Sequence, residues 1–123
     1  MSAQEFIDLL RRLSEAFGPS GFEDEVRDLV IKELEPYVDE LMVDKWGNVI
    51  GVRYGRRRDL RAMVAAHIDE IGLLIDSIDK SGFLRFRAIG GWNEVTLVGQ
   101  RVVIKTVDGR KIKGVIGSRP PHV

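Results

Sequence analysis

Apolar residues in the first 17 positions recur at the three- and four-residue spacing that places them on one face of a helix. Ser2 precedes this segment and Glu5 follows three residues later. This is the spacing of a capping box, in which each side chain satisfies a free backbone N–H of the other residue. Gly18-Pro19 ends the pattern. The sequence therefore predicts an amphipathic helix that begins after Ser2 and ends before Gly18.

The same helical spacing of apolar residues returns over residues 26–34. Ser20 and Glu23 repeat the capping-box spacing ahead of this segment. Pro36 follows it and cannot continue a helix interior. We therefore expect a second amphipathic helix that is capped by Ser20 and ended by Pro36.

Beyond residue 37 the apolar period shortens to two, which is typical of strands. We expect a strand, a turn and a strand over residues 38–54, with the turn at residues 45–48. Two more hairpins are expected over residues 71–89 and 102–116. In the last of these, Asp108-Gly109 favours a two-residue turn, whose residues need positive φ.

Residues 62–66 are apolar on both faces, a pattern that suits a central strand covered on each side. The two tryptophans flank this strand-rich region. We expect Trp46, in a turn, to pack partly against a sheet edge, and Trp92, beside Gly90-Gly91, to be more exposed.

Composition limits the classes of function. Hydrophobic residues make up 44% of the 123 residues, and 19 Lys and Arg balance 19 Asp and Glu, so no net charge attracts nucleic acid or an anionic membrane. Residues 1–44 nevertheless carry 12 acidic and 4 basic side chains, and residues 45–123 carry 7 and 15. Cysteine is absent, and no apolar run approaches the roughly 20 residues of a membrane helix. We expect a cytoplasmic protein with no nucleic-acid and no membrane partner.

The candidate chemistry lies at His67, one of two histidines in the chain. Asp69 follows two residues later, and in a strand this spacing places both side chains on one face. A neutral imidazole binds divalent metals, and a nearby carboxylate orients it. A histidine that simply ends a strand is the alternative interpretation, and the spacing alone does not decide between them.

The longer string around this pair is more specific. Residues 66–72 (AHIDEIG) resemble the first metal-site motif of the tetrahedral (TET) metallo-aminopeptidases, also called deblocking or glutamyl aminopeptidases, some of which carry the name endoglucanase. Further segments resemble that family in the same order along the chain: residues 18–23 (GPSGFE), Asp44 with Gly47-Asn48, residues 82–86 (GFLRF), residues 89–91 (IGG), and residues 114–117 ahead of Pro120-Pro121-His122.

The resemblance implies an α/β fold, in which a zinc-exopeptidase-like catalytic domain is interrupted by an inserted β-barrel lid or dimerisation domain. Residues 1–72 would begin the catalytic domain, and residues 73–123 would begin the insertion. The resemblance further implies that His67 is a ligand to one of two divalent ions, zinc or cobalt. Asp69 would be the supporting carboxylate at the catalytic centre, and His122 would be structural.

Enzymes of that family are several hundred residues long, and the resemblance places their remaining ligands and general base beyond residue 123. Besides His67, the clustered donors here are Asp69 and Glu70. We therefore expect the N-terminal part of a hydrolase that removes N-terminal residues from peptides and forms a homo-oligomer, a dodecamer by the resemblance. The 123 residues alone should be inactive. The alternatives are a non-catalytic assembly or scaffold module, and a nucleic-acid-binding module built on Arg53–Arg61 and Arg110–Lys113.

Overall fold

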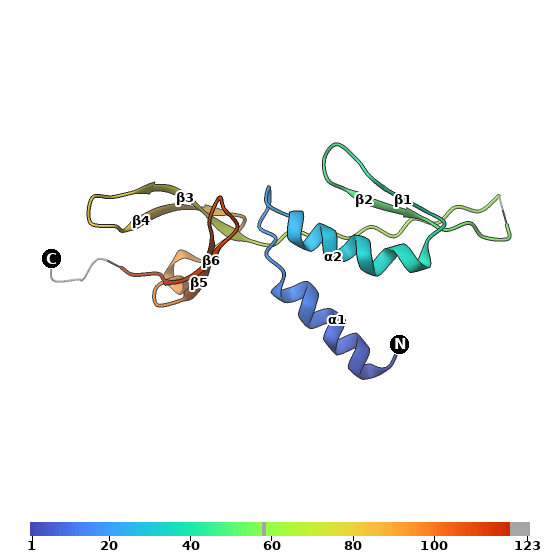
Figure 1. The fold of residues 1–123 in the computed structure, drawn as a ribbon, viewed down its shortest axis with the longest axis horizontal. Helices are drawn as coiled ribbons and strands as arrows, with labels where there is room; N and C mark the ends of the chain where they lie inside the picture. The colour runs from blue at the N-terminus through green and yellow to red at the C-terminus, as the bar shows by residue number, and fades with distance from the viewer. Residues whose placement is uncertain (58, 119–123) are drawn as a thin grey trace. The chain divides into compact units, whose positions relative to one another are not determined.

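The computed structural model describes residues 1–57 and 59–118. They form two helices followed by three β-hairpins (Figure 1). The chain divides into two units, residues 1–90 and residues 91–123. The first unit holds both α-helices and two of the hairpins, and the second holds the last hairpin.

Helix α1 spans Ala3–Glu15, and its N-terminal capping box is confirmed. The Glu5 N–H donates to Ser2 Oγ at 3.2 Å, and the Ser2 N–H donates to Glu5 Oε2 at 2.6 Å. Helix α2 spans Asp24–Leu34 and is followed by the 3-10 turn η1, Glu35–Tyr37, so the helix ends just before Pro36 as expected.

The predicted cap of α2 is wrong. Glu23 occupies the N-cap position and makes no side-chain cap hydrogen bond. Its carboxylate instead accepts from the Gly21 N–H at 2.6 Å. The Ser20 hydroxyl donates to Asp69, a residue 49 positions away. The local capping pattern is therefore overridden by a long-range hydrogen bond.

All strands pair as antiparallel hairpins. In the first unit, β1 (Glu40–Val43) pairs with β2 (Val49–Val52), and β3 (Gly72–Ile78) pairs with β4 (Leu84–Ile89) with a register shift between Ile75 and Ser77. In the second unit, the 3-10 turn η2 (Glu94–Thr96) precedes β5 (Arg101–Lys105), which pairs with β6 (Lys111–Val115). The hairpins thus lie where the period-two pattern predicts them.

The three hairpins share one turn. A glycine N–H donates to the carbonyl three residues earlier: Gly47 to Asp44 at 3.1 Å, Gly82 to Asp79 at 2.9 Å, and Gly109 to Thr106 at 2.9 Å. Each of these glycines has φ between 83° and 88°. The two-residue turn predicted at Asp108-Gly109 is therefore wrong, because only the glycine has positive φ. A three-residue loop with glycine in the left-handed region closes each hairpin.

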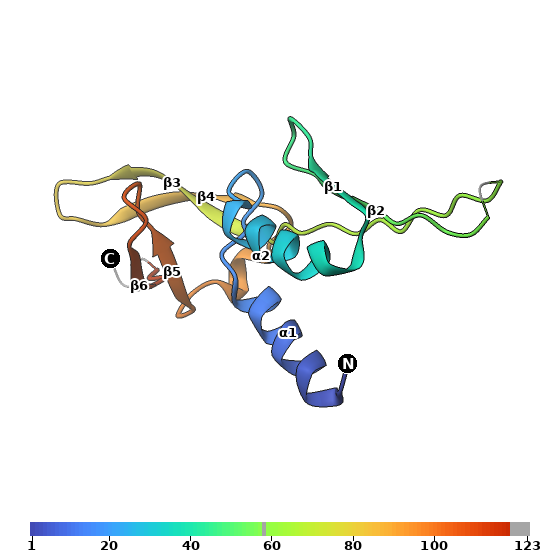
Figure 2. The same cartoon turned by 45° about the vertical axis from the view of Figure 1, so that its right-hand side comes forward.

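Residues 62–66 form no strand, which contradicts the prediction of a covered central strand. The segment runs extended and without a ladder partner among the described residues (Figures 1 and 2). Val64 within it is 98% exposed. A strand that is apolar on both faces needs neighbours to cover it. The described residues do not supply these neighbours.

Few side chains form a core. In the first unit, α2 lies beside the β1–β2 hairpin in both views (Figures 1 and 2). A Cβ on Gly51 of β2 would meet Leu34 and Val38 at 2.8 Å. Among the described hydrophobic residues, those that are buried are Val26 in the first unit and Leu97 and Ile116 in the second.

The tryptophan prediction is wrong in direction. Trp46 is 81% exposed at its hairpin tip, with the Lys45 Nζ 5.7 Å from the centroid of its ring, whereas Trp92 is half-buried.

The expected α/β composition is present, and the described residues show three separate hairpins with no closed barrel. The barrel and the boundary between residues 72 and 73 stay predictions about a longer protein. His122 and the preceding Pro120-Pro121 lie outside the described residues. None of the described helices combines the length and the apolar character needed to cross a lipid bilayer.

Candidate metal site around His67

Two segments that are far apart in sequence meet beside the start of β3. The Glu70 N–H donates to Gly18 O at 2.9 Å, and the Ser20 N–H donates to Glu70 O at 3.3 Å, which makes a short parallel bridge between Pro19 and Glu70. The loop between α1 and α2 accordingly lies next to the first residues of β3 (Figures 1 and 2). The GPSG and HIDEIG segments are therefore one local structure.

Two glycines allow this close approach. A Cβ on Gly18 would lie 2.7 Å from Val26 Cγ1, and a Cβ on Gly72 would lie 2.6 Å from Pro19 Cβ. Both distances are shorter than a carbon–carbon contact tolerates. Larger residues at either position would push the two segments apart, so the glycines fix which residues face each other across the bridge.

The bridge places Ser20 beside Asp69. The Ser20 hydroxyl donates to Asp69 Oδ2, and the other oxygen, Oδ1, lies 3.0 Å from His67 Nδ1. The Ser20 hydroxyl, followed by His67, lowers the pKa of Asp69 below its ordinary value, because both groups stabilise the carboxylate. Asp69 is therefore ionised at neutral pH and shares its two oxygens between these neighbours.

The tautomer of His67 follows from its contacts. Nδ1 lies 2.9 Å from the Asp69 carbonyl oxygen and 3.0 Å from its carboxylate, and both partners are acceptors. In a neutral imidazole, Nδ1 must then carry the hydrogen and Nε2 must carry the lone pair. The His67 side chain is 85% exposed, so Nε2 is accessible to a ligand.

These donors fit one metal ligand with its supporting carboxylate, and they do not complete a site. No group of three or more His, Asp or Glu side chains converges within the described residues. The Glu70 carboxylate accepts from the Gly18 N–H at 3.3 Å and is thereby turned toward the backbone. A catalytic zinc needs three protein ligands and an open position. The described residues alone therefore do not supply the ligand set of a catalytic zinc.

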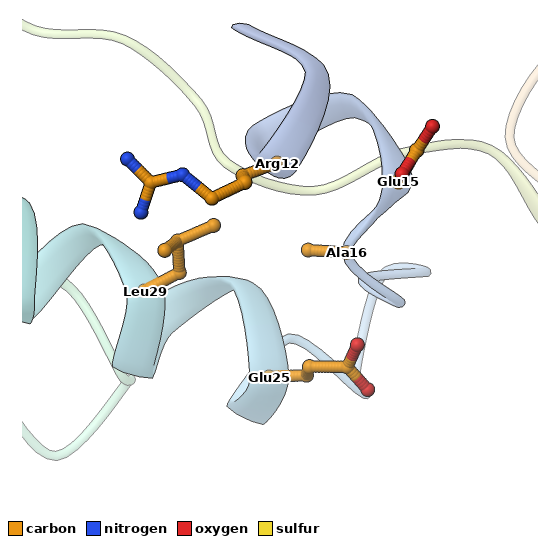
Figure 3. A pocket seen from close by; sticks show the side chains of 5 residues that line it. All are labelled: Arg12, Glu15, Ala16, Glu25 and Leu29. Atoms are coloured by element: carbon orange, nitrogen blue, oxygen red, sulfur yellow. The ribbon is translucent and has the colours of Figure 1, made fainter. Parts of the chain in front are cut away.

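An open groove between α1 and α2 is a separate feature. It has a volume of about 320 Å³ and is lined by Arg12, Glu15, Ala16, Glu25 and Leu29 (Figure 3). Figure 3 shows the Glu15 and Glu25 carboxylates well apart from each other. The Glu25 carboxylate accepts from the Phe17 N–H at 3.3 Å at the end of α1. The groove does not include His67 or Asp69, and its charged groups do not converge on one point.

Three arginines of the basic segments have local partners. Arg53 donates to the Tyr37 carbonyl at 2.9 Å, Arg57 pairs with Asp59 at 2.6 Å, and Arg110 pairs with Asp108 at 2.7 Å. Guanidinium groups that already face carboxylates in their own turns are poor phosphate contacts. For these three arginines, the arrangement favours solvated turns over a nucleic-acid surface.

The family model for M42 glutamyl aminopeptidases matches residues 47–123, which is more than half of the chain and includes His67 and Asp69. The chain belongs to the M42 glutamyl aminopeptidase family. The resemblance to glutamyl aminopeptidases, expected from the motifs, is thereby confirmed.

Relatives of this M42 chain extend the match to nearly its whole length. The putative aminopeptidase FrvX of Escherichia coli is 47% identical over 116 residues, which are 94% of this chain and 32% of that protein. The solved aminopeptidase APDkam598 of Desulfurococcus kamchatkensis has 50% identity and a TM-score of 0.93, over 97% of this chain and 33% of that one. The chain therefore spans about a third of the length of the relatives it matches.

A third relative informs on assembly. The TET1 peptidase of Pyrococcus horikoshii can assemble into a tetrahedron or a large octahedral shell. It is 38% identical to this M42 chain, with a TM-score of 0.80 over 95% of this chain and 34% of that one. The α/β arrangement described above is thus shared with solved TET aminopeptidases.

Sequence reasoning brought His67 and Asp69 together correctly, although they lie in an extended segment and not in a paired strand. It missed Ser20 as their neighbour. The available signal was the position of Ser20 within the GPSG motif, but its spacing to Glu23 also matched a helix cap and was interpreted that way.

Proposed function

We propose that this M42 chain is the N-terminal part of a dinuclear-metal aminopeptidase, a hydrolase that removes N-terminal residues from peptides. The observation that carries the proposal is the hydrogen bonding of His67. Its Nδ1 is held by Asp69 and its Nε2 is left accessible, which is the arrangement of a metal-ligating histidine with its supporting carboxylate. The span of a third of its relatives' length supports the proposal of an N-terminal part.

Each residue has a defined role in this proposal. His67 binds one metal ion through Nε2. Asp69 accepts a hydrogen bond from the Nδ1–H, which keeps Nε2 unprotonated and fixes the orientation of the ring. When bound, two divalent ions, zinc or cobalt, polarise the substrate carbonyl and activate a water molecule.

The proposal extends to architecture and assembly. Residues 1–72 begin a zinc-exopeptidase-like catalytic domain, and residues 73–123 begin an inserted β-barrel lid or dimerisation domain. The protein acts on peptides in the cytoplasm as a homo-oligomer, and we propose a dodecamer. The assembly of the Pyrococcus horikoshii relative supports the oligomer.

The metal role is tested by comparing two lengths of chain. The 123 residues alone should bind zinc only weakly and should not turn over an amino-acid anilide, because His67 and neighbouring carboxylates cannot close a dinuclear site. A longer protein that supplies the remaining ligands should bind two metal ions and turn over the anilide.

In that longer protein, His67→Ala should lower the metal content measured by plasma emission spectrometry and abolish turnover. His122→Ala is the matched histidine control and should keep the metal content, because the resemblance gives His122 no role in binding metal. Full metal content in His67→Ala would refute the assignment. Assembly of the longer protein without bound metal or turnover would favour the scaffold alternative.

A further inference from the structure

We infer that Ser20 is a positioning residue for the metal site: its hydroxyl holds Asp69 in the orientation that keeps the hydrogen of His67 on Nδ1 and the lone pair on Nε2. The inference rests on the proposed function of His67 as a metal ligand. Ser20 lies 49 positions before Asp69 and touches no metal in this scheme, so it acts through Asp69.

The two oxygens of Asp69 have separate partners. Oδ2 accepts from the Ser20 hydroxyl, and Oδ1 lies 3.0 Å from His67 Nδ1. Because a hydrogen bond fixes one oxygen, the carboxylate group as a whole cannot rotate freely. The Ser20 hydrogen bond therefore sets the direction in which Oδ1 faces the imidazole.

Packing alone does not hold this arrangement. The side chain of Asp69 is 39% exposed and that of His67 is 85% exposed, so neither is confined by a core. Without Ser20, the Asp69 side chain gains rotational freedom. The Asp69 backbone carbonyl, 2.9 Å from Nδ1, is then the one acceptor of the Nδ1–H that stays fixed. Hydrogen bonding, and not burial, determines the geometry.

Backbone hydrogen bonds place Ser20 beside Asp69 independently of the Ser20 side chain. The Ser20 N–H and the Glu70 N–H both bond across the bridge, and Gly18 and Gly72 permit the close approach. Replacing the hydroxyl therefore leaves the bridge in place. Ser20 also caps no helix, since α2 has Glu23 at its N-cap, so its hydroxyl is committed to Asp69.

The test measures the His67 tautomer directly in the metal-free 123-residue chain. Nitrogen-15 shifts of the two ring nitrogens are recorded at a pH where the imidazole is neutral, in the unchanged chain and in Ser20→Ala. We expect the ratio of the Nδ1–H to the Nε2–H form to fall about 2- to 10-fold in Ser20→Ala, the range that one net hydrogen bond supports. An unchanged ratio would overturn the inference.

Two further variants and one exchange measurement separate positioning from a general structural effect. Ser20→Thr retains the hydroxyl and should retain the ratio. Ser14→Ala removes a hydroxyl that donates to Leu10 O at 2.8 Å in α1, and it should change nothing at His67. Slow exchange of the Glu70 amide in Ser20→Ala verifies that the bridge still forms.

A double-mutant cycle tests whether Ser20 acts through Asp69. Asp69→Ala alone should shift the tautomer ratio at least as much as Ser20→Ala, and adding Ser20→Ala to it should have no further effect. Additive shifts would overturn the inference. The proposed function is refuted by a different result, full metal content in the His67→Ala variant of the longer protein. Failure of the Ser20 inference and failure of the proposed function are therefore distinguishable.

Discussion

Substitution of Gly72 by alanine is the most direct perturbation of the bridge that carries the site. The new Cβ would lie 2.6 Å from Pro19 Cβ and 3.0 Å from Pro19 Cγ. A proline ring cannot rotate away, so the backbone of one segment must move. The movement separates the GPSG loop from the start of β3.

The magnitude follows from two opposing effects. Overpacking of this kind costs about 1–3 kcal/mol, and the reduced freedom of the unfolded chain on changing glycine to alanine returns about 0.4–1 kcal/mol. We expect a net loss of about 1–2 kcal/mol in the stability of the bridge. This corresponds to an opening equilibrium that is about 5- to 30-fold more populated.

Hydrogen exchange measured by NMR reports this opening at two amides. The Glu70 N–H, which donates to Gly18 O, and the Ser20 N–H, which donates to Glu70 O, should both exchange about 5- to 30-fold faster in Gly72→Ala. Gly55→Ala is the matched control, since a Cβ there would meet its nearest neighbour, Arg57 O, at 3.9 Å. Unchanged exchange at both amides in Gly72→Ala, or equal acceleration in the control, would refute the reasoning.

Other predictions concern separate features. Gly18→Ala should lower the stability of the first unit, measured by thermal unfolding, because the new Cβ would lie 2.7 Å from Val26 Cγ1. Adding Val26→Ala should relieve part of that loss, and strictly additive effects of the two substitutions would contradict the clash. The Asp44 carboxyl should titrate below its ordinary range by carbon-13 NMR, because hydrogen bonds from the Asn48 side chain and from its own turn lower its pKa. Since that pKa is lower in the folded state, its stabilisation of the turn is present above the unfolded pKa and lost as pH falls through the folded one. In single-tryptophan variants, acrylamide should quench Trp46 more strongly than Trp92, and similar quenching of the two would disagree with their exposures.

Features that depend on neighbours in sequence could be predicted well. The capping box joins Ser2 and Glu5, which are three residues apart. The paired residues of each hairpin also lie close to their turn in sequence. The position of the turn at Asp108-Gly109 was predicted correctly, but its length was not. Asp-Gly is compatible with both a two-residue and a three-residue loop, and strand register selects between them.

Features that depend on distant partners could not be predicted from local pattern. Ser20 has the spacing of a helix cap, and nothing within its neighbourhood shows that Asp69 competes for its hydroxyl. Residues 62–66 have the composition of a central strand, but a strand exists only beside a partner, and none lies within the described residues. His67 and Asp69 were found because the contiguous string of residues 66–72 around them resembles a family motif, whereas their two-residue spacing alone did not decide their role.

The long span of the bridge sets the order in which this region can fold. Each hairpin turn closes a loop of about four residues, whereas the Gly18–Glu70 contact joins residues that are 52 positions apart. Loop-closure entropy makes the longer closure costlier by about 2 kcal/mol. Hairpins and helices of this size form within microseconds. The contact that aligns Ser20 with Asp69 therefore forms late, so in a newly made chain the helices and hairpins can form before Ser20 meets Asp69.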